Sequence, residues 1–153
     1  MEADEVNKLA DWMRTEGAKV NELSGRLREH IVSIPPGSLN NWLRELNQRF
    51  DHFTSHFKRM MHIEEEGGYL TPVVEQRPTL SKQVELLRHQ HDELRRLMDD
   101  LDRTLRSLTP EDQLLIRDCC TRLQIFIGHV GRHEEHENHI VLYSFTQDIG
   151  THD

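Results

Sequence analysis

The stretch LQIFIGHVGRHEEHENHI, residues 123–140, decides which fold the chain is expected to adopt. Its apolar side chains recur every three or four residues, which is the spacing of one face of an α-helix. His133 and Glu137 lie on that same face, where the pattern requires buried apolar side chains. The segment therefore predicts a long amphipathic helix with two polar side chains turned toward the protein interior.

Strong helix breaks divide the chain into four segments of this kind. The breaks are PPG at 35–37, the stretch from Pro72 to Pro78, and SLTPED at 107–112. In the last of them, Thr109 is expected to cap the fourth helix and Pro110 to occupy its first position. Because the connections are short, we predict an all-α fold, an antiparallel up-down-up-down four-helix bundle, with residues 1–153 forming a single domain.

Polar residues interrupt the apolar stripes at four positions, Glu64, His91, His133 and Glu137. Buried carboxylates are costly unless they are paired or bound to a metal, so these four are the candidate metal ligands. At about 100° per residue, His62 instead points away from the stripe of the second helix. If the pair Gly67 and Gly68 only weakens that helix, it continues toward Val74.

The rise of about 1.5 Å per residue places His91 and His133 at similar heights after an antiparallel turn. The first hairpin has the same spacing, with Gly17 corresponding to His91, Met60 to His133, and Glu64 to Glu137. The two hairpins therefore look like an internal pseudo-repeat. The remaining histidines are expected at the rim or surface: His30, His52, His56, His62, His89, His129, His136, His139 and His152. Among them, His129 is also a candidate ligand, because it forms an HxxxH pair with His133.

Composition excludes several classes of function. The net charge of −8 argues against a nucleic-acid backbone or an anionic membrane as partner. No signal peptide or transmembrane segment is apparent in the sequence. The only cysteines, Cys119 and Cys120, are neighbours and cannot link distant segments, so we expect the protein in the reducing environment of the cytoplasm. We expect one of the two cysteines to be buried and the other not. No nucleophile–base arrangement, phosphate loop or cofactor fingerprint supports an enzyme.

The stretches HQHDEL with His91, HEEHEN with His133 and Glu137, EEEGGYL with Glu64, and the closing TQDIGTHD resemble the hemerythrin-like family, also called HHE cation-binding domains. The resemblance implies a four-helix bundle that holds a non-haem di-iron site. It also implies histidine at two positions where this chain has Gly17 and Met60. Both departures lie in the first hairpin, and in the family those two histidines hold one of the two irons.

Three hypotheses follow for the function. The first is a metal protein whose site has fewer ligands than the family pattern and holds a single ion. Its ligands are Glu64, His91, His133 and Glu137, and it takes iron, with Zn or Mn as alternatives. The resemblance then implies sensing or handling of O₂, NO, peroxide or iron. The second is a metal-free bundle that serves as an interaction or regulatory module, in which the same residues neutralise one another. The third is a complete site with two irons, in which a kink brings in residues from the first two helices: His30, His56, His62 and Glu66.

Overall fold

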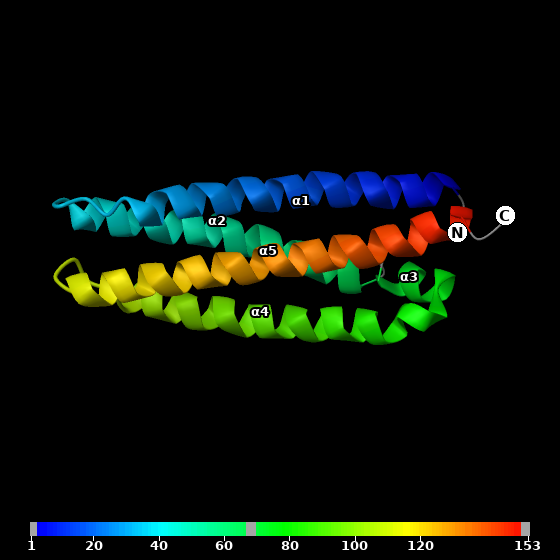
Figure 1. Ribbon diagram of the computed structural model, residues 1–153. Coiled ribbons are helices and arrows are strands. Elements are labelled where there is room, and N and C mark those ends of the chain that lie inside the picture. The colour runs from blue at the N-terminus through cyan, green and yellow to red at the C-terminus, as the bar shows by residue number, and fades with distance from the viewer. Residues whose placement is uncertain (1–2, 67–69, 151–153) are drawn as a thin grey trace.

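The computed structural model describes residues 3–66 and 70–150, and within them the side chains of residues 8–66 and 70–143. These residues form α1 (Ala3–Val32), α2 (Leu39–Glu65), α3 (Leu70–Gln76), the short 3₁₀ helix η1 (Pro78–Leu80), α4 (Ser81–Ser107) and α5 (Gln113–Gly150). The described part of the chain contains no strand. The predicted all-α class and the antiparallel packing of four long helices are confirmed (Figure 1).

Each long helix has two long neighbours. α1 packs against α2 and α5, and α4 packs against the same two helices, so the four surround a common interior. Helix α3 contacts α4 and α5 and lies at the end of the bundle that also holds the N-terminus (Figure 1). This arrangement brings one face of every long helix into the interior, as the apolar stripes predict.

The interior consists of two apolar clusters with a polar layer between them. The larger cluster contains Phe50, Phe53, Phe57 and Phe126, and the smaller one contains Leu70, Val73, Val84, Leu87 and Ile140. On α4, His91 lies one turn from Leu87 of the smaller cluster and one turn from Leu94 of the larger one. Four buried side chains lie between the clusters, and we call them the polar layer: Glu64, His91, His133 and Glu137.

The fourth long helix begins three residues later than predicted. It starts at Gln113, so the prediction of Thr109 as its cap and Pro110 as its first residue is wrong. Instead, the Asp112 amide donates a hydrogen bond to the Thr109 carbonyl over 3.1 Å, and the Thr109 hydroxyl donates to the Asp112 carboxylate over 2.9 Å. Residues 109–112 therefore form a turn of their own before the helix begins.

The connection between α2 and α4 also differs from expectation. Helix α2 ends at Glu65, so the predicted continuation toward Val74 is wrong, and α3 is a separate short helix with Pro72 in its first turn. Residues 67–69 lie outside the described residues. Leu70 and Val73 of α3 are buried, so this segment closes the end of the smaller apolar cluster.

Both cysteines are buried, so the prediction that only one of them would be is wrong. Helix α5 contacts both α1 and α4, and its buried sector is therefore wide enough to include two consecutive residues. Burial raises the pKa of the Cys119 and Cys120 thiols to about 11. Both thiols are therefore protonated at neutral pH and poor nucleophiles.

Candidate metal centre

Two imidazoles and one carboxylate converge at the centre of the polar layer. The Glu137 Oε2 atom lies 3.1 Å from His91 Nε2 and 3.1 Å from His133 Nε2. His91 comes from α4, and the other two come from successive turns of α5. All three are buried, each offers one donor atom, and these atoms lie within 4.8 Å of one another. The predicted equality in height of His91 and His133 is confirmed, with ring centroids 4.8 Å apart.

Glu64 of α2 completes the layer from the opposite side. Its Oε1 lies 3.5 Å from His91 Nε2, and its side chain is 1% exposed. Burial would raise the pKa of the Glu137 carboxyl, but a hydrogen bond from Glu64 and the neighbouring imidazoles of His133 and His91 outweigh it and hold this pKa well below its usual range. Glu137 is thus held as a carboxylate in the buried layer.

The donor set fits a divalent transition metal. Metal–nitrogen and metal–oxygen bonds of about 2.1 Å allow two ligands of one ion to be up to about 4.2 Å apart, and both 3.1 Å separations satisfy this limit. His133 Nε2 and Glu137 Oε1 are buried, and neither makes a hydrogen bond to any described residue. Buried polar atoms normally have a partner. These two atoms are therefore available to an ion at the same point.

A carboxylate outside the layer orients His91. The His91 Nδ1–H group donates to Glu65 Oε1 over 2.8 Å, which leaves Nε2 directed at Glu137 and Glu64. The Arg95 guanidinium binds both oxygens of Glu65, over 2.8 Å and 3.1 Å. Burial would raise the pKa of the Glu65 carboxyl, but the Arg95 and His91 hydrogen bonds lower it. Glu65 is therefore a charged acceptor that fixes the tautomer of His91.

An amide performs the same task for His133. The His133 Nδ1–H group donates to Gln90 Oε1 over 2.7 Å, and the ring stands edge-on to Phe57. The stripe pattern of the sequence did not identify Gln90 or Glu65, because both lie beside the apolar stripe and are only half-buried. Their positions next to His91 and Glu64 in the sequence were the available signal.

The sequence also failed to identify Glu134, a buried carboxyl on the α1 side of α5. A Cβ atom placed on Gly17 would lie 3.9 Å from Glu134 Oε2, so Gly17 and Glu134 face each other. Glu134 is 8% exposed, and its Oε1 has no hydrogen-bond partner among the described residues. Burial and the charge of Glu137 raise the pKa of Glu134 to about 8. The half of the interior that lacks the two histidines therefore contains a protonated carboxylic acid.

The histidines of the first two helices do not join this cluster. His62 and Glu66 are exposed, as predicted for His62. The His30 ring stacks on Trp42 and bonds to the Trp42 carbonyl, while His56 pairs with Glu16 over 3.0 Å. The described residues therefore do not assemble the complete two-iron arrangement of the third hypothesis.

His129 is also outside the cluster. It is exposed, and its Nδ1 accepts a hydrogen bond from Arg132 over 2.9 Å. His152 lies outside the described residues, as do the side chains of the TQDIGTHD stretch.

A four-helix bundle whose apolar interior is interrupted by buried histidines and carboxylates defines a class of helical proteins with an internal cation site. The model of the hemerythrin HHE cation-binding domain matches residues 8–143. The chain belongs to this family, as the sequence resemblance predicted. No curated protein and no solved structure matches the chain in the corresponding comparisons. Among the described residues, no helix has the length and hydropathy that crossing a bilayer requires.

Proposed function

We propose that the chain binds one non-haem iron ion through His91, His133 and Glu137, with Glu64 as the fourth ligand. The observation that carries this proposal is the position of Glu137 Oε2, 3.1 Å from the Nε2 atoms of both histidines in a buried layer. Two imidazoles and carboxylates suit Fe(II), with Mn(II) and Zn(II) as competing ions. The layer is buried, and Glu65 and Gln90 fix the tautomers of the two ligating rings.

A four-ligand ion leaves an open coordination position, where the metal would bind a small molecule such as O₂ or NO. The function that we propose is therefore sensing or handling of such a molecule, or of iron itself. Gly17 and Met60 replace the two histidines that the HHE pattern assigns to the second iron, so one ion is expected rather than two. A thioether packs well but is a weak ligand for iron. The proposal includes no catalytic reaction.

A metal-free interaction module is a second candidate function, and the contacts within and beside the polar layer favour it. His91 already bonds to Glu65 through Nδ1 and to Glu137 through Nε2. Glu64 also makes a hydrogen bond to Glu137. The acids and bases of the polar layer thus compensate much of one another's desolvation without an ion.

Elemental analysis separates the two candidates. Protein expressed in iron-supplemented medium is expected to contain about one iron per chain, and the double variant His91→Ala, His133→Ala is expected to contain none. The matched control is His89→Ala, His139→Ala, which removes exposed imidazoles from the same two helices and should leave the iron content unchanged.

Each other result has a defined meaning. Iron content that persists in the His91→Ala, His133→Ala variant would contradict the assigned ligands. Two irons per chain would show that other residues replace the histidines missing at positions 17 and 60. No metal under any supply would leave the interaction module as the function that the structure supports.

Glu65→Gln is expected to weaken metal affinity by about 10- to 100-fold, the usual effect of removing the partner of a ligating histidine. The amide cannot act as a charged acceptor for His91 Nδ1–H, and it also loses one of the two bonds to Arg95. Competition with a chelator measures the affinity. Glu66→Gln, one residue further along and exposed, is the control, and an equal loss in both variants would contradict the role of Glu65.

A further inference from the structure

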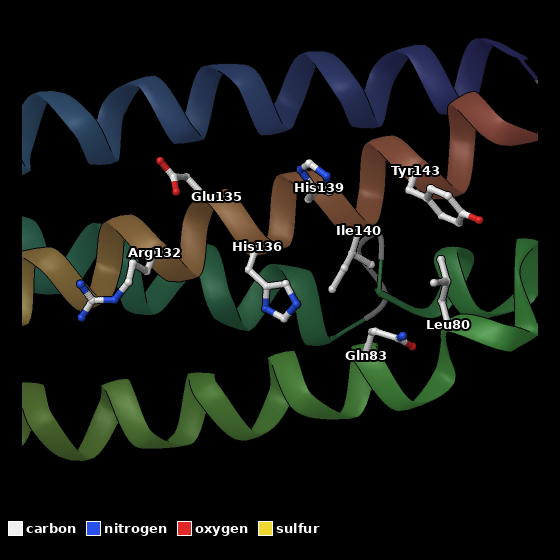
Figure 2. A pocket seen from close by; sticks show the side chains of 8 residues that line it. All are labelled: Leu80, Gln83, Arg132, Glu135, His136, His139, Ile140 and Tyr143. Atoms are coloured by element: carbon white, nitrogen blue, oxygen red, sulfur yellow. The ribbon is translucent and has the colours of Figure 1, made fainter.

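A groove between α4 and α5 reaches the outer side of the candidate metal centre. It has a volume of about 520 Å³, and its lining includes Gln90 and Glu93 of α4 and His129, Arg132, His133 and His136 of α5. A second hollow of about 500 Å³ adjoins the groove, and Arg132 and His136 line both. Figure 2 shows these two side chains, with His136 pointing from α5 toward α4. His133, which is 4% exposed, therefore forms part of the lining of the groove.

The groove contains more hydrogen-bond donors than the protein uses. Arg132 donates to His129 Nδ1 over 2.9 Å, and no carboxylate of the described residues lies within ion-pair distance of its guanidinium. Gln90 Oε1 accepts the bond from His133, while the amide nitrogen of Gln90 has no acceptor among the described side chains and backbone. A cation without a counterion and an amide without an acceptor thus line one small cavity.

The lining of the groove is less acidic than the chain as a whole. The chain carries a net charge of −8, yet Arg132 and the imidazoles of His129, His133 and His136 gather here. The carboxylate in this lining is Glu93, which is exposed and lies 3.4 Å from His89. Arg132 is therefore the charged donor that this lining offers to a small anion.

We propose that the groove between α4 and α5 binds a small oxyanion, with Arg132 and the Gln90 amide as its main donors. A planar guanidinium suits the paired oxygens of a carboxylate, nitrite or phosphate group, and the groove is wide enough to admit such an ion together with water. Binding to the groove is independent of the metal. One consequence rests on the proposed function. An anion bound to Gln90 changes the hydrogen bond between Gln90 and His133, and through it the optical spectrum of an iron ion bound to His133.

Titration of metal-free protein with inorganic phosphate tests the site. In the presence of EDTA, we expect saturable shifts in the NMR signals of the Gln90 side-chain amide and of backbone amides in residues 129–136. Arg132→Gln should weaken phosphate binding by about tenfold, because it removes the charge-assisted bonds. Arg122→Gln is the matched control, since Arg122 is an exposed arginine of the same helix that pairs with Asp118 over 3.1 Å.

Shifts that do not saturate, or equal affinity in the Arg132 and Arg122 variants, would overturn the anion site. Because this experiment uses metal-free protein, its failure leaves the metal proposal intact. A second titration, on iron-loaded protein with an optical spectrum as readout, tests the coupling alone. A spectrum that changes with phosphate in the wild type but not in Arg132→Gln is the expected result, and a change of equal size in both would show direct binding of phosphate to the ion instead.

Discussion

The double variant Gly17→His, Met60→His is expected to bind two metal ions per chain, where we propose that the natural sequence binds one. The resemblance to the HHE family implies histidine at both positions, and the two substitutions would supply the two neutral nitrogen ligands that the first hairpin lacks. A Cβ atom at Gly17 would make an ordinary contact of 3.9 Å with Glu134, so the backbone can carry a side chain at this position. Met60 is 1% exposed, and its replacement therefore lies in the interior of the bundle.

Elemental analysis and the optical spectrum of the iron-loaded variant measure this gain. Each single variant provides one extra ligand and should remain near one ion per chain. Gly25→His is a further control, because it adds an imidazole on α1 where the added Cβ meets nothing within 4 Å. If the folded double variant still bound a single ion, Gly17 and Met60 would not be the positions that determine the number of irons.

The second large effect is a change in the pH dependence of stability when Glu134 is replaced by Gln. Burial and the charge of Glu137 raise the pKa of Glu134 to about 8 in the folded protein, whereas the unfolded chain has an ordinary value near 4.5. Both states bind this proton below pH 4.5. As the pH rises toward 8, only the unfolded state loses it, so the free energy of unfolding falls by about 1.4 kcal/mol per pH unit within that window.

Glu134→Gln removes this loss, because glutamine does not ionise in either state. The variant should therefore gain stability relative to the wild type between pH 4.5 and pH 8, by a total on the order of 4 kcal/mol. Urea denaturation of metal-free protein at several pH values measures the difference. Glu135→Gln, an exposed neighbour, should show no such gain, and parallel stability curves for wild type and Glu134→Gln would contradict the buried, protonated state.

Periodicity was sufficient to predict the helices and the polar layer. Glu64, His91, His133 and Glu137 were identified because each breaks an apolar stripe, and the structure brings all four to one level. His62 was excluded by the same geometry, and it is exposed. The sequence could predict these features because a helix repeats its faces at a fixed angle, so one register determines the direction of every residue along it.

Two of the residues that the sequence did not identify lie on α5, whose buried face is wider than one apolar stripe. Glu134 and Cys120 each follow a stripe residue directly, and both are buried because α5 packs against helices on two sides. Glu65 and Gln90 were missed for a different reason. They contact ligands on neighbouring helices, and sequence spacing within one helix does not report such contacts. The turn at Thr109 was mistaken for a cap because Thr and Asp both hydrogen-bond to nearby backbone or side chains outside helices.

The polar layer has a consequence for the assembly of the bundle itself. Apolar side chains in the two clusters on either side are largely interchangeable, so they would tolerate a helix that slid along its axis by one turn, about 5.4 Å. Such a slide would move Glu137 or His91 against phenylalanine or leucine and leave a buried charge without its partner. Only one axial alignment of α2, α4 and α5 satisfies all four polar side chains. The layer therefore selects a single arrangement of the helices during folding, whether or not an ion is present.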